Sequence, residues 1–194
     1  RDVRGVTFRA GLRDGQVVAQ AQGLRAVMHG NYRPGTVNDA RNMRHDAALV
    51  QLTQPIPAAT ADPFVVQRAA GGLSDVSVVS YARGRADALS RQAACGVLWR
   101  QQGLFAFDCD VTFGSSGAPV FDGSGGRPRI VSLISSVNHS ATGTVAIGME
   151  LPGLVADMKA ALRSGKGVFP KREVSAKRLR VGQSGGSGAK FVRP

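Results

Sequence analysis

The sequence predicts an all-β protein with one helix near its end and a basic tail. Three observations lead to this fold class. Short β-rich runs recur along the chain, Gly, Asp, Asn and Pro separate them, and a single segment has convincing helical periodicity. Strands at this spacing are typical of a sandwich or a barrel. The hydrophobic content of 43% is normal for a folded protein, and 194 residues fit one domain or two small lobes.

The first strand set lies in residues 1–62. We expect strands over Val3–Arg9, Val17–Ala21 and Ala47–Leu52, because each is a short β-rich or apolar run bounded by turn residues. The segment Gln54–Ala61 contains two prolines among small residues. We therefore expect it to cross to the second set as extended chain without regular structure.

The second strand set and the helix occupy residues 63–163. Leu151–Leu162 places its apolar side chains on one stripe, Pro152 suits a first helical turn, and Gly165 can end the helix. Six runs before the helix are predicted strands: Val76–Tyr81, Gly96–Trp99, Leu104–Phe107, Pro119–Phe121, Arg129–Val137 and Thr144–Met149.

Residues 164–194 form a basic tail that carries +7 of the formal net charge of +12. Apolar residues are isolated there, so we expect Lys166–Pro194 to be largely disordered. The rest of the chain lacks the basic helix or strand face of a nucleic-acid module, and no nucleic-acid partner is expected. The tail is interpreted as a linker or as an electrostatic anchor for anionic surfaces. No stretch approaches the roughly 20 apolar residues of a transmembrane helix.

The segment around Ser116 has the composition of a nucleophile turn. Gly114 and Gly117 bracket this serine, so the backbone can turn sharply and expose the hydroxyl group. A nucleophilic serine also needs backbone N–H groups aimed at the developing oxyanion, and those of Gly114 and Ser116 are the natural pair. The alternative is an ordinary turn, since Gly and Ser are common turn residues.

A second motif surrounds Asp46, which opens the apolar run Ala47–Leu52. A buried carboxylate at the start of a strand can orient a catalytic imidazole and stabilise its protonated form. The alternative is a strand start or a helix cap. The two motifs together, in the order Asp before Ser, favour catalysis. Ala118 and the strand-like run after it argue against the nucleophile elbow of an α/β-hydrolase.

Cys95 and Cys109 are the only cysteines, and they flank the apolar stretch Gly96–Phe107. Their spacing excludes a C-x-x-C motif. A bridge between them could close a hairpin and would add about 3 kcal/mol in the chain-entropy model. The alternative is two free thiols in a cytosolic protein. We favour the bridge, which implies an oxidising compartment and a secreted or periplasmic protein.

Several motifs resemble those of the chymotrypsin-fold serine proteases. Gly114–Val120 looks like the Gly-x-Ser-Gly-Gly/Ser-Pro-Val signature, and His45–Leu52 resembles the family's Asn-Asp-Ile-Ala-Leu-Leu-x-Leu. Asp108–Asp110 resembles the bacterial trypsin-like and glutamyl-endopeptidase-like members, in which the central cysteine is bridged to one upstream. Ile130–Ser136 resembles the strand that lines the substrate groove, and Gly143–Gly148 the strand that closes the specificity pocket. The resemblance covers most of the chain up to about Leu162.

The resemblance implies two lobes of Greek-key β-barrels and serine endopeptidase activity on protein or peptide substrates. Ser116 would attack the scissile carbonyl, Asp46 would orient the histidine, and the N–H groups of Gly114 and Ser116 would hold the oxyanion. Water would then hydrolyse the acyl-enzyme. No metal or organic cofactor is implied. The rival interpretation is a pseudo-protease that keeps the groove as a binding protein without catalysis.

The catalytic histidine of the family has no match in this chain. It lies in an Ala-Ala-His-Cys segment, and none of the three histidines has that context. His45 adjoins Asp46, so along a strand the two side chains would point to opposite faces. His29 matches a surface position of the family, and His139 follows the groove-lining strand. We therefore expect the N-terminal lobe to be incomplete, with the histidine upstream of Arg1.

The resemblance also bears on which side chain of the substrate is preferred. Asp110 precedes Ser116 by six residues, where a trypsin-like pocket carries its base carboxylate, and this favours Arg or Lys in the substrate. The alternative is a structural role for Asp110. Ser135, Ser136 and Val137 would contact the substrate from the groove-lining strand. Ser115 replaces the Asp of the trypsin signature, so activation by a freed amino terminus is not expected.

Overall fold

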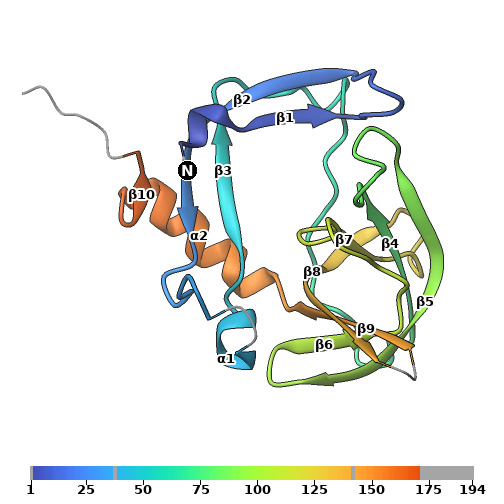
Figure 1. Ribbon diagram of the computed structural model, residues 1–194. Coiled ribbons are helices and arrows are strands. Elements are labelled where there is room, and N and C mark those ends of the chain that lie inside the picture. The colour runs from blue at the N-terminus through green and yellow to red at the C-terminus, as the bar shows by residue number, and fades with distance from the viewer. Residues whose placement is uncertain (1, 37–38, 141–142, 171–194) are drawn as a thin grey trace, which may run out of the picture.

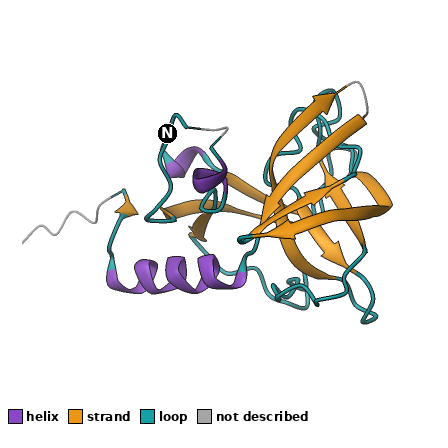
Figure 2. Cartoon of the chain, turned by 90° about the horizontal axis from the view of Figure 1, so that it is seen from below, coloured by secondary structure: helices purple, strands orange, loops and turns teal. Residues whose placement is uncertain are grey.

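The fold consists of a closed β-barrel and a smaller open β-sheet, with a helix packed against the sheet (Figures 1 and 2). The computed structural model describes residues 2–36, 39–140 and 143–170. Within these ranges, no helix is long and apolar enough to cross a membrane. The all-β prediction with one C-terminal helix is confirmed for the described chain, apart from two short helical turns in the first half.

Six strands close the barrel in the order β4-β5-β6-β9-β8-β7, and every neighbouring pair is antiparallel. The barrel interior is filled by a cluster of apolar side chains that includes Phe105, Phe107, Val120 and Ile134, each at most 1% exposed. The strands are β4 (Asp75–Ser80), β5 (Ser90–Gln101), β6 (Leu104–Phe107), β7 (Pro119–Asp122), β8 (Arg129–Ser140) and β9 (Gly143–Met149).

The first half of the chain forms a sheet that does not close. Its central strand is β2 (Ala19–Met28), which pairs with β1 (Thr7–Ala10), β3 (Ala48–Leu52) and β10 (Val168–Phe169). Several of its apolar side chains remain exposed, among them Phe8 at 50% and Leu24 at 45%. A barrel description therefore fits the C-terminal lobe alone, and the N-terminal lobe is an open four-stranded sheet.

Helix α2 (Pro152–Ser164) follows β9 and lies along the open sheet (Figure 2). Leu154 and Met158 point into an apolar cluster that also holds Val27 of β2 and Met149 of β9. Gly165 ends the helix in the left-handed conformation, as predicted, with φ of 77°.

The strand β10 lies in the segment that was expected to lack regular structure. Val168 pairs with Val27 and is 8% exposed, because it packs in the same apolar cluster as α2. The local composition does not predict that Val168 packs against β2, because two apolar residues among Gly and Lys are typical of a loop. The remainder of the predicted tail, residues 171–194, lies outside the described residues.

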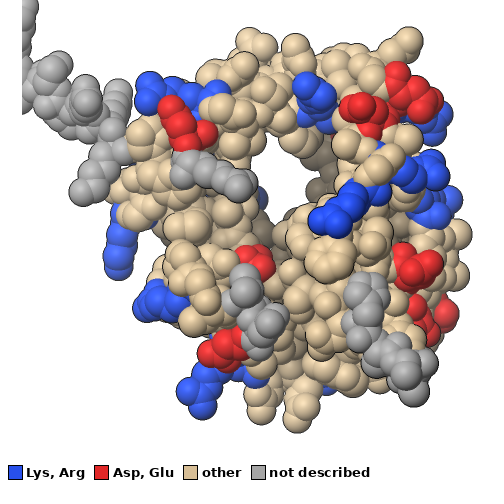
Figure 3. All heavy atoms as spheres, viewed as in Figure 1, with Lys and Arg blue, Asp and Glu red and all other residues tan. Residues whose placement is uncertain are grey.

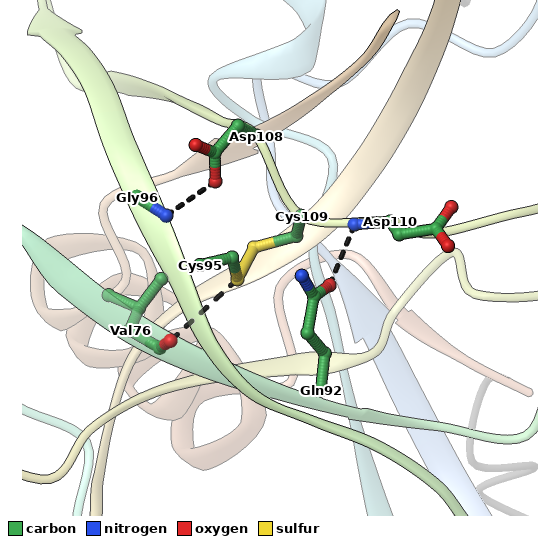
Figure 4. Close-up of a disulfide and its surroundings, with 7 residues drawn as sticks. All are labelled: Val76, Gln92, Cys95, Gly96, Asp108, Cys109 and Asp110. Atoms are coloured by element: carbon green, nitrogen blue, oxygen red, sulfur yellow. Dashed lines mark hydrogen bonds between the residues drawn. A yellow bond between two sulfur atoms is a disulfide. The ribbon is translucent and has the colours of Figure 1, made fainter.

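The two cysteines are joined, as predicted (Figure 4). Cys95 lies in β5 and Cys109 two residues beyond β6, and both are buried. The carboxylate of Asp108 accepts a hydrogen bond from the Gly96 N–H group beside the bridge. The bridge therefore ties the segment that leads to Ser116 to the neighbouring barrel strand.

Candidate active site

Ser116 lies in a tight loop between β6 and β7. The serine is exposed, while its neighbour Ser115 is 1% exposed and contacts the Ser80 hydroxyl group at 3.3 Å. Gly114 has φ of 94°, and a Cβ there would approach Arg83 N to 2.9 Å. Position 114 therefore requires glycine for two reasons: the backbone has a positive φ, and residues 82–83 approach too closely for a side chain. The predicted sharp turn with an exposed hydroxyl group is present.

Some backbone N–H groups of the loop donate hydrogen bonds within the protein, and others do not. Ser115 N donates to Thr112 O at 3.0 Å, Gly117 N to Ile134 O at 2.7 Å, and Ala118 N to Ser115 O at 2.9 Å. The N–H groups of Gly114 and Ser116 have no acceptor in the described part of the chain. These are the two donors assigned to the oxyanion from the sequence. The arrangement leaves them available for a negatively charged oxygen.

Asp46 accepts a hydrogen bond from the Ser135 hydroxyl group at 2.7 Å. The aspartate immediately precedes β3 and is half-buried, and Ser135 lies in the barrel strand β8. Ser136 also faces the Asp46 segment, since its hydroxyl group contacts the sulfur of Met43 at 3.0 Å. The side chains of Ser135 and Ser136 therefore fasten the residues before β3 to the barrel.

The strand β8 contacts both the loop of Ser116 and the segment of Asp46. Ile134 O accepts the Gly117 amide hydrogen, which fixes the loop one residue after Ser116. The next residue along β8, Ser135, holds the carboxylate of Asp46. Gly117, which follows Ser116, and Asp46 are therefore bonded to adjacent residues of the same strand, although Ser116 and Asp46 are 70 positions apart in the sequence.

The loop before Asp46 is organised by a single buried amide. Asn42 is 5% exposed and lies in the short helix α1 (Ala40–Met43), which the sequence analysis missed. Its Oδ1 accepts from Arg33 N at 2.7 Å, and its Nδ2 donates to Arg33 O at 3.0 Å and to Thr36 O at 3.1 Å. Asp39 caps the helix by accepting a hydrogen bond from Arg41 N.

Replacing Asn42 with Ala is expected to lower the free energy of unfolding by about 1–3 kcal/mol, because three backbone groups lose their buried partner. Urea denaturation would measure the change. Asn31→Ala serves as the matched control, since Asn31 is exposed and its side chain makes no hydrogen bond within the described residues. Equal stability of the two variants would show that Asn42 does not hold the loop.

Two of the three histidines stack on each other beside Asp46. The rings of His29 and His45 lie 4.7 Å apart and nearly parallel. His29 is 8% exposed, so its predicted surface position is wrong, and its Nε2 lies 3.4 Å from Asp157 Oδ2 on α2. His45 Nδ1 is buried without a hydrogen-bond partner in the described chain. Neither imidazole is hydrogen-bonded to Asp46 or Ser116.

Burial, followed by the charges of His29 and Arg44, lowers the pKa of His45 below its ordinary value of about 6.5. The unfolded chain therefore binds more protons than the folded chain between the two pKa values. This contribution to stability is complete above pH 6.5 and is lost as the pH falls through the lowered value.

We expect the urea midpoint to fall more steeply between pH 7 and pH 5 in the wild type than in His45→Phe. Phenylalanine keeps a flat ring against His29 but cannot titrate, so the comparison isolates the proton. The measurement is a series of urea transitions at half-unit pH steps. Parallel pH profiles of the two proteins would contradict the assignment of this pH dependence to His45.

Asp110 lines a cavity on the barrel. This cavity has a volume of about 360 Å³, and Arg91 and Gln92 of β5 also line it. The side-chain amide oxygen of Gln92 accepts a hydrogen bond from Asp110 N at 2.7 Å. Ser135, Ser136 and Val137 do not line it. The preference for Arg or Lys stays a prediction.

Sequence reasoning missed the partners that these side chains find across the fold. The contact between the Ser135 hydroxyl group and Asp46 was not predicted, and the expected substrate contact of Ser135 stays a prediction. The pairing of His29 with His45 and Asp157 was also missed. A serine in a β-rich run and an aspartate in a helix carry no local signal of such partners, because the pairing depends on how the sheets and the helix meet.

The family model described as "Trypsin-like peptidase domain" matches residues 6–128. This span includes Asp46, both cysteines and Ser116. The chain therefore belongs to the trypsin-like peptidase domain family. Comparison with curated protein sequences found no match.

Solved structures of bacterial-type proteases share the fold at low identity. A Glu endopeptidase in complex with MPD is 16% identical, with a TM-score of 0.60 over 80% of this chain and 70% of that one. Protease Anisep from Arthrobacter nicotinovorans is 16% identical, with a TM-score of 0.62 over 78% and 71%. The thermostable serine protease AL20 from an extremophilic microorganism is 16% identical, with a TM-score of 0.61 over 80% and 74%. The chain therefore has the chymotrypsin-like fold.

Proposed function

We propose that the protein is a serine endopeptidase in which Ser116 is the nucleophile and Asp46 orients the general base. The proposal is supported by two contacts with neighbouring residues of β8: Gly117, which follows Ser116, donates to Ile134 O, and Asp46 accepts from the Ser135 hydroxyl group. Ser116 gives its proton to the general base and attacks the scissile carbonyl, and the N–H groups of Gly114 and Ser116 stabilise the oxyanion. The peptide C–N bond then breaks, and the protonated base gives the proton to the leaving amine, which departs as the first fragment. Water then hydrolyses the acyl-enzyme and releases the second peptide fragment.

The general base in this proposal is a histidine outside the 194 residues, on an N-terminally extended polypeptide. The positions of the histidines in this chain support it. His29 is engaged with Asp157, and His45 stacks on His29. His139 lies in β8, four residues beyond Ser135. A base must come within about 3 Å of the serine hydroxyl group.

The proposal extends to location and substrates. A bridge between Cys95 and Cys109 persists in oxidising compartments, which supports a secreted or periplasmic protein. Membership of a peptidase family supports protein or peptide substrates. The basic residues after Ser164 would serve as a contact for anionic surfaces, and no nucleic-acid partner or cofactor is required for the reaction.

Labelling with a serine-directed fluorophosphonate tests the function. The 194-residue chain, the N-terminally extended polypeptide and its Ser116→Ala variant would be compared by gel fluorescence. We expect labelling of the extended polypeptide alone and its complete loss in Ser116→Ala. The matched control is Ser124→Ala, which changes a serine outside the site and should label normally.

Two outcomes would contradict the proposal. Labelling of the 194-residue chain at Ser116 would mean that one of its own histidines serves as the base. A folded extended polypeptide that does not label would favour the second candidate function, a pseudo-protease that binds peptides without cleaving them. The observation favouring that candidate is that neither His29 nor His45 forms a hydrogen bond with Asp46 in the described part of the chain.

A further inference from the structure

A second cavity lies where the tip of the β1–β2 hairpin meets the barrel, at the upper right of Figure 1. Its volume of about 620 Å³ is in the range of small-molecule sites. Leu12 and Val18 of the hairpin form one wall, and Tyr81, Leu89 and Phe121 of the barrel form the other. Neither Ser116 nor Asp46 lines it, so it is separate from the candidate active site.

The walls of this cavity are held in place by contacts on both sides. The Tyr81 hydroxyl group donates to Leu12 O at 2.6 Å, and Asp14 N donates to Asp87 O at 2.8 Å. Phe64, in the connection between the two lobes, packs edge-on against Phe121 with ring centroids 4.8 Å apart. The cavity is therefore formed before any ligand binds, which limits the entropy lost on binding.

The lining leaves apolar surface uncovered. Phe64 is 48% exposed, Val18 is 62% exposed, and Tyr81 and Leu89 each remain more than a third exposed. Figure 3 shows an opening between the open sheet and the barrel, with both basic and acidic side chains where the hairpin tip meets the barrel at the upper right. An apolar ligand would remove this surface from water at the place where the two lobes meet.

The charges of the lining have one sign. Arg13 and Arg91 are the charged residues of the cavity wall, and neither forms an ion pair in residues 2–36, 39–140 and 143–170. Asp14 and Asp87 lie close in sequence to the hairpin and the barrel wall, but they do not line the cavity. A guanidinium group without a carboxylate partner is a ready binding group for a carboxylate.

We propose that this cavity binds a single-chain fatty acid, with the alkyl chain against Phe64, Val18 and Leu89 and the carboxylate toward Arg13 or Arg91. The charge of the lining selects the anionic head, and the size of the cavity selects one chain. The inference does not depend on peptidase activity, because it uses neither Ser116 nor Asp46.

Isothermal titration calorimetry of the 194-residue chain with octanoate, decanoate and dodecanoate, each below its micelle-forming concentration, tests this site. We expect one molecule bound per chain and an affinity that rises about fourfold for each added methylene that enters the cavity. Dodecanol should bind about tenfold more weakly than dodecanoate, and dodecyltrimethylammonium more weakly still, because Arg13 and Arg91 repel a cation.

Two variants locate the site. Val18→Glu places a carboxylate in the exposed part of the wall and should weaken dodecanoate binding at least tenfold, whereas Leu98→Glu makes the same kind of change outside the cavity and should not. The double change Arg13→Gln and Arg91→Gln should remove the preference for the anionic head. Circular dichroism would confirm that each variant is folded.

The proposal is overturned if dodecanoate produces no saturable heat. It is overturned equally if Val18→Glu and Leu98→Glu bind alike, or if the three head groups bind with the same affinity. The double arginine variant provides support that does not depend on Val18→Glu. It should lose the preference for the anionic head group and keep the dependence of affinity on chain length.

Discussion

Changing Asp46 to Asn is expected to lower kcat/KM for peptide hydrolysis about 10⁴-fold in the N-terminally extended polypeptide. The carboxylate would accept a hydrogen bond from the base imidazole and stabilise its protonated form, whereas an amide can present an N–H group and favour the wrong tautomer. The Ser135 hydroxyl group already donates to Asp46 Oδ2 at 2.7 Å, so an asparagine oxygen can take this place without disturbing β8. The fold should therefore survive the substitution.

Two further variants separate catalysis from packing. Ser135→Ala removes one hydrogen bond to a charged group and should lower kcat/KM by about 10- to 100-fold, far less than Asp46→Asn. Asp75→Asn makes the same chemical change on an exposed residue of β4 and should leave kcat/KM unchanged. Rates with a fluorogenic peptide would be compared across the three variants. A loss below tenfold in Asp46→Asn would remove this aspartate from the mechanism.

Replacing Phe107 with Ala is expected to lower the free energy of unfolding by about 3–5 kcal/mol. Phe107 is fully buried in the barrel interior and stacks on Phe105 with ring centroids 5.6 Å apart. It also lies two residues before the bridged Cys109, so the surrounding barrel cannot easily collapse into the space left by the ring. A loss of this size is a large share of the 5–15 kcal/mol that stabilises a typical domain.

Phe113→Ala is the matched control, because this phenylalanine is 67% exposed in the loop before Ser116. Its replacement should change stability by no more than about 0.5 kcal/mol. Urea denaturation of both variants, followed by far-UV circular dichroism, would give the two values. A similar decrease in the free energy of unfolding for both variants would mean that packing in the barrel interior is not the main source of stability.

The predicted strands agree best with the structure where local sequence and burial coincide. Leu104–Phe107 is strand β6 with the predicted bounds, since all four residues are buried. The strand β2 is much longer than predicted, because Gln22 and Gly23 interrupt the apolar pattern and read as its end. Gly23 is instead required inside the sheet, where a Cβ would lie 2.6 Å from Val3 O. The glycine marks a close approach of two segments rather than a turn.

The sequence by itself determined the fold class, the C-terminal helix, the bridged cysteines and the sharp turn that exposes Ser116. These features depend on neighbours in the chain, such as Gly114 and Gly117 around the serine, and local pattern is sufficient to predict them. The tertiary structure alone decided which side chains meet. Asp46 and Ser135 are 89 residues apart, and His29 and Asp157 are 128 apart. Their contacts follow from barrel closure and from the docking of α2 on the open sheet, and no short segment encodes either.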